Sequence, residues 1–364
     1  MMQGRRILLF PVLVLLGAFL LDKIFFIGNL EDYFLTTASF KNYNHKVEML
    51  DELEEYLQRS DRKKVLALFG NSRTMPFSNQ YIAERYPNWI LFNFSVPGGT
   101  SDYYLYLLEQ FEKRGLKPDH VFLAITPQGM NRTAAVSLDE VMITGLPPGF
   151  VARHASSYSL DDLSNYVAKK TFLVYQYRPK LWVIRDRMKE GHLDQFRGFL
   201  GLLEDALRKE RGSVPVKAEE GVVESEEKME VYARSIWKDF FVPFHLSEDQ
   251  VYFTRHGLEI LHDLNVPTDL LWVRVSENLR RRIDTEKVAF RDGERSRHTV
   301  REVWEPAMRQ LAGQFNARFL DMNFSTEFPC DQFSDASHLS AACFDEFTDY
   351  LMNEIENRRI GEGM

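Results

Sequence analysis

The stretch Val65-Leu66-Ala67-Leu68-Phe69-Gly70-Asn71-Ser72-Arg73 joins a continuous apolar run to a short polar loop. An apolar run of this length is typical of a strand that is buried on both faces of a parallel sheet. In such sheets ligands bind at the carboxyl ends of the strands. Ser72 follows the run directly, so the sequence places a hydroxyl group at that edge of the sheet.

Further strands and helices alternate on both sides of this run. The expected strands are 89–94, 120–125, 268–275 and 317–320, and the main expected helices are 41–58, 101–114, 302–315 and 340–360. Alternation of this kind predicts an α/β fold with right-handed crossovers. We expect a doubly wound, parallel five-stranded sheet in a three-layer, flavodoxin-like arrangement.

The alternation is interrupted between residues 131 and 250, where aromatic, basic and amphipathic helical segments follow one another. We therefore expect one α/β domain, 31–364, that contains a large helical insertion at about 131–250. The insertion is interpreted either as an elaborated helical cap or as a lid or docking surface. In the second interpretation, Trp182, Tyr175 and Tyr177 are candidates for stacking on a sugar.

The N-terminal segment carries a charge-free apolar run at 7–21, followed after two charged residues by a second apolar stretch at 24–27. Together they approach the roughly 20 residues that a membrane-spanning helix needs. We expect residues 1–30 to be an uncleaved membrane anchor; a cleaved signal peptide is the alternative. Arg5 and Arg6 precede the run, which predicts a single-pass inner-membrane protein with its C-terminal domain in the periplasm or outside the cytoplasm.

Composition excludes several classes of protein. The formal net charge of -8 over 364 residues argues against binding to nucleic acid, which needs a basic face. With only two cysteines, Cys330 and Cys343, the chain has no cysteine-rich metal motif, and we expect neither a metal nor a cofactor. Outside the cytoplasm these cysteines can form a disulfide; two buried free thiols are the alternative.

A second motif, Asp335-Ala336-Ser337-His338, lies near the end of the chain. A serine hydroxyl becomes a nucleophile when an imidazole accepts its proton, and a carboxylate must hold the other imidazole nitrogen. Ser72, His338 and Asp335 are therefore candidates for a catalytic triad, with Asp331 as a rival acid. The alternatives are a serine that caps a turn and a histidine on a surface loop.

Four segments in order resemble the conserved blocks of the SGNH, or GDSL-like, hydrolases. They are Gly70-Asn71-Ser72, Asn93-Phe94-Ser95-Val96-Pro97-Gly98-Gly99-Thr100, Ala124-Ile125-Thr126-Pro127-Gln128 and Asp335-x-x-His338. The chain departs from the family pattern at Asn71, Ser95 and Gln128, where Asp, Gly and Asn are usual. It is similar to the membrane-anchored bacterial branch that includes DltD and alginate O-acetyltransferase-like proteins, and most similar to uncharacterised SGNH-like membrane proteins.

The resemblance implies a role for each matching residue. Ser72 would attack an acyl carbonyl, His338 would carry the proton and Asp335 would orient the imidazole. The backbone N–H groups of Ser72 and Gly98 would bind the oxyanion, together with the side-chain amide of Gln128 or, alternatively, of Asn131. Arg73 and Asn71 are candidates for substrate binding, although a structural salt bridge is the favoured interpretation of Arg73.

Two functions are consistent with the sequence. The first is a membrane-anchored serine acyl-ester enzyme of the bacterial cell envelope, either an esterase or an O-acyltransferase. Its partners would be an envelope glycan or another acylated substrate and a membrane acyl-donor protein. The second is a non-catalytic, SGNH-like envelope binding or accessory module. A hydrogen bond between Ser72 Oγ and a His338 nitrogen would favour the enzyme, because the alternative does not need one.

Overall fold

The central element of the computed structural model is a sheet of five parallel strands in the order β2-β1-β3-β4-β7. The structure describes all residues except 1, 25–29, 133–140, 215–223, 290–296 and 363–364. The strands are β1 (Lys64–Phe69), β2 (Trp89–Asn93), β3 (His120–Ala124), β4 (Thr268–Trp272) and β7 (Arg318–Asp321). The parallel five-stranded α/β sheet expected from the sequence is confirmed.

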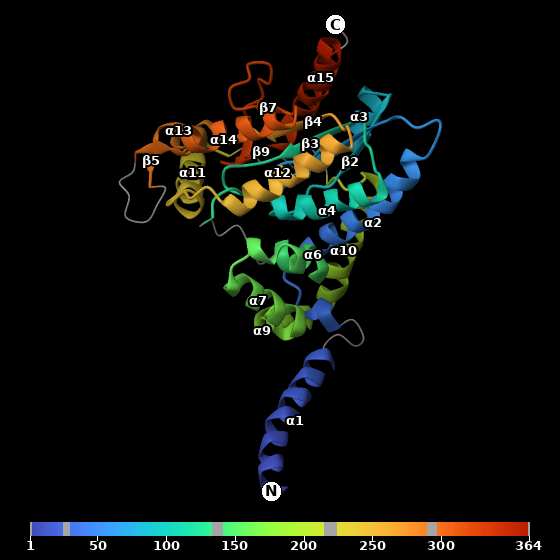
Figure 1. The fold of residues 1–364 in the computed structure, drawn as a ribbon, viewed down its shortest axis with the longest axis vertical. Helices are drawn as coiled ribbons and strands as arrows, with labels where there is room; N and C mark the ends of the chain where they lie inside the picture. The colour runs from blue at the N-terminus through green and yellow to red at the C-terminus, as the bar shows by residue number, and fades with distance from the viewer. Residues whose placement is uncertain (1, 25–29, 133–140, 215–223, 290–296, 363–364) are drawn as a thin grey trace.

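Helices cover both faces of this sheet (Figure 1). On one face, α3 contacts α15, since the hydroxyls of Tyr81 and Tyr86 both donate to Asp349 Oδ1. On the other face, α4 and α12 lie side by side, and α14 packs on β4, with Trp304 edge-on against Trp272. The bounds are α2 (Ser39–Leu57), α3 (Asn79–Arg85), α4 (Ser101–Arg114), α12 (Glu248–Asp263), α13 (Glu277–Thr285), α14 (Val300–Gln314) and α15 (Phe344–Glu362). Two short antiparallel pairs complete the strands: β5 (Lys287–Val288) with β6 (His298–Thr299), and β8 (Phe333–Asp335) with β9 (His338–Leu339).

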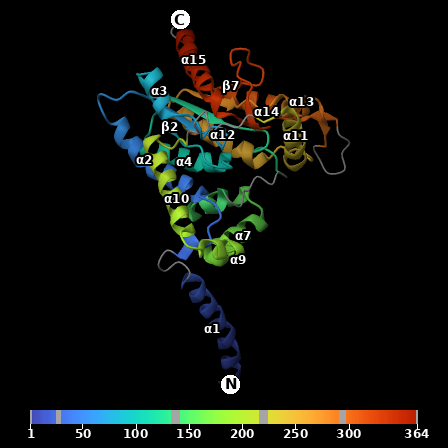
Figure 2. The ribbon, with the colours of Figure 1, turned by 180° about the vertical axis from the view of Figure 1, so that it is seen from behind.

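The segment between β3 and α12 is mainly helical, but it divides into two parts. Helices α6 to α10 gather at the end of the molecule that faces α1, whereas α11 lies beside α13 (Figures 1 and 2). The bounds are α6 (Pro148–Arg153), α7 (Leu160–Thr171), α8 (Leu173–Tyr177), α9 (Leu181–Arg187), α10 (His192–Lys209) and α11 (Glu226–Phe240). The division follows from the turn after α10, which returns the chain to the sheet.

This turn is bonded directly to the carboxyl end of β2. Asn93 N–H donates to Arg211 O at 2.9 Å, and the Asn93 amide donates to Ser213 Oγ at 3.2 Å. The fully buried Lys46 ammonium donates to Asn93 O and to Gly212 O, and its burial lowers the pKa of Lys46 well below the usual range. Since Asn93 also donates to the carbonyl of Thr74 at 2.9 Å, the turn and the loop after β1 are held by one side chain.

The N-terminal helix α1 (Met2–Ile24) extends away from the body of the molecule (Figures 1 and 2). Its end is attached to α8, because the Asp22 carboxylate accepts from Leu173 N–H at 2.8 Å and from Val174 N–H at 2.7 Å. Within the described residues, no helix combines the length and the apolar character that crossing a membrane requires. The membrane-spanning part of the expected fold, at residues 1–30, is therefore unsupported here.

A buried ionic network fixes the amino-terminal edge of the sheet. Asp269 on β4 is fully buried and accepts from His120 Nε2 at 3.0 Å, Arg318 Nη2 at 2.8 Å and Arg358 Nη1 at 3.0 Å. Burial alone would raise the pKa of Asp269, but the hydrogen bonds from Arg318 and His120 outweigh it and lower the pKa. The carboxylate therefore joins β3, β4, β7 and α15 in its ionised form.

We expect Asp269→Ala to lower the free energy of unfolding by about 3–5 kcal/mol, since it leaves buried cationic groups without a partner. The measurement is urea unfolding at pH 7. Because the pKa in the folded state lies below the unfolded value of about 3.9, the contribution is complete above that pH and is lost as the pH falls below it. Asp263→Ala is the control, since its carboxylate is 70% exposed and, among the described residues, bonds only to His262. Equal effects of the two variants would contradict the expectation.

Candidate active site

The loop after β1 is held close to its neighbours because residue 70 has no side chain. A Cβ on Gly70 would lie 2.1 Å from Thr74 Oγ1 and 3.2 Å from Ser95 Oγ, so only glycine fits between them. Thr74 Oγ1 and Ser95 Oγ are themselves hydrogen-bonded at 2.8 Å. The Asn71 side chain closes the turn by accepting from Arg73 N–H at 3.1 Å. Ser72 is thus presented on a short, well-supported turn at the carboxyl edge of the sheet.

The strands β8 and β9 form a hairpin that brings His338 and Asp335 to Ser72. Ser72 Oγ lies 2.7 Å from His338 Nε2, although 266 residues separate the two in the chain. His338 Nδ1 lies 2.8 Å from Asp335 Oδ2. The imidazole and the carboxylate are each about one third exposed, so a substrate can reach them. The structure therefore joins the three residues in the order hydroxyl, imidazole, carboxylate.

The second oxygen of Asp335 accepts three hydrogen bonds from the same hairpin. Asp335 Oδ1 accepts from Ser337 N–H at 2.7 Å, Ser337 Oγ at 3.0 Å and His338 N–H at 3.0 Å. Burial alone would raise the pKa of Asp335, but the hydrogen bond and charge of His338 and the donors from Ser337 outweigh it and lower the pKa. The rival acid Asp331 is exposed and makes no hydrogen bond with the described residues.

The backbone N–H groups of Ser72 and Gly98 have no hydrogen-bond partner among the described residues. Gly98 has a φ of +66°, which glycine adopts without strain. The loop that carries it lies against the serine loop, because Val96 N–H donates to Gly70 O at 3.1 Å. A Cβ on Gly99 would lie 2.5 Å from Gly70 O, so a second glycine is needed for the same contact. Both N–H groups are available to a ligand.

Arg73 and Gln128 meet beside the serine loop, although they come from loops after different strands. Arg73 is buried, and its guanidinium donates to Gln128 Oε1. Burial lowers the pKa of Arg73 to about 10, while Asp335 and Tyr104 act in the opposite direction. Arg73 forms no ion pair with the described residues, so the expected structural salt bridge is replaced by a bond to an amide. The Gln128 Nε2 group keeps its hydrogens free of any described partner.

Asn131, the alternative amide, serves another purpose. Its Nδ2 donates to Phe240 O at 2.8 Å and to Pro243 O at 2.9 Å, and its Oδ1 accepts from His245 N–H at 2.8 Å. Both amide hydrogens are therefore used in holding the chain segment before α12. Asn131 is the alternative oxyanion donor expected from the sequence, and in this structure its amide hydrogens are already bonded to these two carbonyls.

The candidate sugar-stacking aromatics lie elsewhere. Tyr175 and Tyr177 are on α8 and Trp182 is on α9, in the group of helices next to α1 (Figure 1). The structure thus does not bring these three to the serine.

One contributor missed in the sequence is Ser337, whose hydroxyl lies 3.1 Å from His338 Nδ1 as well as donating to Asp335. Its place inside the Asp-x-Ser-His turn was the available signal, because Asp side chains often accept from the N–H two residues on.

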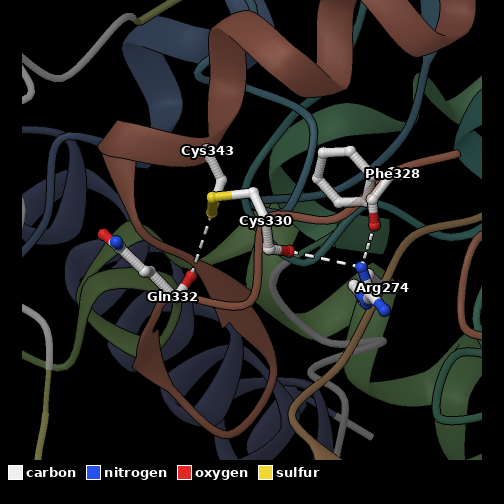
Figure 3. The surroundings of a disulfide bond; sticks show 5 residues. All are labelled: Arg274, Phe328, Cys330, Gln332 and Cys343. Carbon is white, nitrogen blue, oxygen red and sulfur yellow. Dashed lines mark hydrogen bonds between the residues drawn. A yellow bond between two sulfur atoms is a disulfide. The ribbon is translucent and has the colours of Figure 1, made fainter. Parts of the chain in front are cut away.

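A disulfide braces the hairpin. Cys330 and Cys343 are bonded, with 13 residues of separation, and the loop that they close contains both Asp335 and His338 (Figure 3). The same figure shows Arg274, whose guanidinium donates to the carbonyls of Phe328 and Cys330 and so fixes the start of this loop. Of the two alternatives that the sequence left open, the structure contains the disulfide.

We expect Cys343→Ser to lower the free energy of unfolding by about 3 kcal/mol, because closing a loop of this size restricts the unfolded chain. Urea unfolding of the oxidised wild type and the variant measures the difference. Dithiothreitol is the internal control: it should destabilise the wild type to a similar extent and leave the variant unchanged. A reductant effect of equal size on both proteins would contradict the assignment of the stability to this bond.

One solved structure, of a protein from Streptococcus pneumonia described as a candidate platelet activating factor, is similar at a TM-score of 0.30 and 12% identity, over 85% of this chain and 92% of that one. A score this low carries no conclusion about fold or function. No curated protein matches the sequence. A family model described as protein of unknown function, DUF1574, matches residues 2–355. Since the match spans nearly the whole length, the chain belongs to the DUF1574 family.

Proposed function

We propose that this protein is a serine acyl-ester enzyme of the bacterial cell envelope, an O-acyltransferase or esterase that acts on a glycan or another envelope polymer. The observation that carries the proposal is the hydrogen-bonded series Ser72 Oγ, His338 Nε2, His338 Nδ1 and Asp335 Oδ2, with distances of 2.7 and 2.8 Å. This is the arrangement in which an imidazole can accept a proton from a hydroxyl. The resemblance of four sequence segments to SGNH hydrolases points to the same chemistry.

In the first half of the proposed reaction, Ser72 Oγ attacks the acyl carbonyl carbon and its proton passes to His338 Nε2. The resulting C–O bond creates a tetrahedral intermediate with a negative oxygen. When the intermediate collapses, the ester bond breaks and His338 returns the proton to the departing alcohol oxygen. Asp335 holds Nδ1–H throughout and stabilises the imidazolium. The product is an acyl ester on Ser72.

In the second half, an acceptor hydroxyl gives its proton to His338 Nε2 and its oxygen attacks the acyl-enzyme. Collapse breaks the bond to Ser72 Oγ, which recovers its proton from His338. Water as acceptor makes the protein an esterase, and a sugar hydroxyl makes it an O-acyltransferase. Both outcomes use the same three residues, so the acceptor that reaches Ser72 decides between them.

The proposed oxyanion donors are the backbone N–H groups of Ser72 and Gly98 and the amide of Gln128. Glutamine is one methylene longer than the asparagine usual in the resembling family. The longer side chain can adopt more conformations, and Arg73 restricts it by donating a hydrogen bond to Gln128 Oε1. The Nε2 group is then the free end of the amide. We therefore assign Arg73 a positioning role. Donors fixed in advance stabilise a developing oxyanion more than water does, because they need no reorganisation.

The test is labelling of the purified protein with a fluorophosphonate, followed by intact-mass measurement. An activated serine displaces fluoride from phosphorus and retains the phosphonyl group, so the probe needs no knowledge of the natural substrate. A single adduct on the wild type, absent from Ser72→Ala and His338→Ala, supports the proposal. A folded wild type that remains unlabelled refutes it and favours a non-catalytic envelope module.

We also propose that residues 1–30 anchor the protein in the inner membrane, with the C-terminal domain on the periplasmic side and the acyl donor supplied by a membrane protein. The support is the exposure of the apolar side chains of α1. The apolar side chains of α1 that are at least half exposed to solvent are those of Phe10, Val12, Leu13, Val14, Leu15, Leu16, Leu20 and Leu21. A helix that is apolar all round is stable where lipid covers it.

Alkaline carbonate extraction of bacterial membranes tests the anchor. The full chain should remain in the membrane pellet, whereas a chain without residues 1–24 should appear in the supernatant. Release of the full chain by carbonate would overturn the proposal, because only peripheral proteins are extracted in this way. A periplasmic marker protein in the same sample controls for complete lysis.

A further inference from the structure

A polar cavity lies beside the loops that carry Gly98 and Gln128. Ser72, His338 and Asp335 do not line it. Its volume is about 310 Å³, which is within the range of small-molecule sites. Thr100 and Gly129 belong to its wall. Consecutive Cα atoms are about 3.8 Å apart, so Gly129 directly adjoins Gln128 and Thr100 lies within about 7.6 Å of Gly98. The cavity therefore reaches the two loops that carry Gly98 and Gln128.

One buried amide in the wall of this cavity has a nitrogen without a partner among the described residues. Gln250 is 6% exposed and its Oε1 accepts from Ser101 N–H at 2.9 Å. Its Nε2 makes no hydrogen bond with the described residues and is not among the buried, unpaired polar atoms, so some of its surface stays accessible. Gln250 lines the cavity, so a ligand there can reach this side chain. A buried amide left in this state favours a ligand with oxygen acceptors.

A carboxylate on the same wall is also unpaired. Asp249 is half-buried and forms no hydrogen bond or ion pair with the described residues. Burial raises the pKa of Asp249, as do the charges of Glu248 and Asp162, whereas Arg132 lowers it. A partly desolvated carboxylate of this kind is stabilised by hydroxyl or amine donors. With the Gln250 amide, the wall thus offers both an acceptor and a donor.

The charges of the cavity disfavour anionic ligands. Among the described lining residues, two carboxylates, Asp249 and Asp162, oppose the guanidinium of Arg132. Tyr158 and Phe253 add an aromatic wall, with ring centroids 5.8 Å apart. The Tyr158 hydroxyl is fixed by donating to Asp102 Oδ2 at 3.2 Å, so the ring is held in place. Polar groups of both kinds beside an aromatic ring suit a sugar ring, which has hydroxyls at its edge and C–H groups on its face.

We infer that this cavity binds a pyranose sugar, uncharged or amino-substituted, as the acceptor or carrier of the acyl group. The inference rests on the proposed function for the role of the sugar, but not for its binding. It differs from the sequence-based expectation, because the sugar contacts Gln250, Asp249 and Tyr158 instead of the aromatics on α8 and α9. A sugar bound in this cavity would have hydroxyls next to the loops that carry Gly98 and Gln128.

Saturation-transfer difference NMR tests the binding with glucose, galactose, mannose, N-acetylglucosamine, glucosamine and glucuronate. We expect at least one of the first five to bind the wild type, and glucuronate to bind more weakly. Gln250→Glu keeps the acceptor for Ser101 N–H and removes the free donor; Asp249→Asn removes the charge. Each should weaken binding by about tenfold or more, because each loses a hydrogen bond that involves a buried or charged group.

Glu248→Gln is the matched control, since Glu248 precedes Asp249 in the same helical turn but is exposed and does not line the cavity. It should bind the sugar as the wild type does, and far-UV circular dichroism verifies that all variants are folded. The inference is overturned if none of the six sugars binds, if glucuronate binds best, or if Glu248→Gln weakens binding as much as Asp249→Asn.

The Ser72→Ala variant separates this inference from the proposed function. It should bind the sugar with wild-type affinity, because Ser72 does not line the cavity. Sugar binding by a wild type that a fluorophosphonate fails to label would refute the enzyme and retain the binding site. Labelling of Ser72 without any sugar binding would retain the enzyme and refute the site.

Discussion

Replacing Ser72 with alanine is expected to lower kcat for hydrolysis of 4-nitrophenyl acetate by about 10⁴- to 10⁶-fold. The expectation follows from the single hydroxyl that lies 2.7 Å from His338 Nε2, since without it the imidazole has no nucleophile to activate. Release of 4-nitrophenol under steady-state conditions measures kcat and KM separately. KM should change little, because the remaining groups that bind the acyl oxygen are intact.

Ser334→Ala is the matched control for this variant. Ser334 lies on the hairpin that carries His338, but within the described part of the chain its hydroxyl donates only to the His338 carbonyl, at 3.3 Å. It should therefore hydrolyse the ester at close to the wild-type rate. Retention of activity by Ser72→Ala would mean that water or another residue attacks the ester, and the proposed acyl-enzyme would have to be abandoned.

Changing Asp335 to asparagine should lower kcat by about 10⁴-fold while leaving the fold intact. Three donors, from Ser337 and His338, surround Asp335 Oδ1 and require an acceptor at that position. The amide oxygen of the asparagine must therefore occupy this side, so its NH₂ group faces His338 Nδ1. The imidazole then carries its proton on Nε2 and cannot accept the proton of Ser72.

Asp331→Asn makes the same chemical change four residues earlier in the same loop, at an exposed position, and should retain activity. The pH dependence of the free energy of unfolding gives a second measurement for Asp335. Its pKa in the folded state is lowered, so the ionised carboxylate stabilises the fold above its unfolded pKa of about 3.9, and this contribution is lost as the pH falls. Stability of Asp335→Asn should accordingly depend less on pH in the acidic range. Equal activity losses in both variants would contradict the assigned roles.

The sequence predicts the sheet well because its signals are local. Residues 65–69 form an unbroken apolar run, and all five are buried on β1 as expected of a central parallel strand. The proximity of His338 to Asp335 is also local, since a turn of three residues brings them together. Pairing of the hairpin with Ser72 could be inferred only by assuming that both lie at the carboxyl edge of one sheet.

Other parts of the site depend on contacts that no local pattern encodes. Arg73 and Gln128 meet because β1 and β3 are neighbours in the sheet, which places the two loops side by side. Asn131 has the amide group that an oxyanion donor needs, but in the folded chain this amide donates to the carbonyls of Phe240 and Pro243. Gln250 lies in the first turn of α12, far along the chain from the other cavity residues Thr100 and Tyr158, so its place in the cavity wall becomes visible only in the folded chain.

The turn after α10 has a consequence for protein engineering. Because Asn93 bonds both to Arg211 and to Thr74, and Val214 N–H donates to Met75 O at 2.9 Å, the insertion supplies partners to the segment that supports the serine. Excising 131–250 to obtain a minimal domain would strip these partners and leave the buried ammonium of Lys46 without its second carbonyl. Residues 211–214 of this segment therefore belong to the folded unit that contains the sheet, and a minimal domain has to keep them.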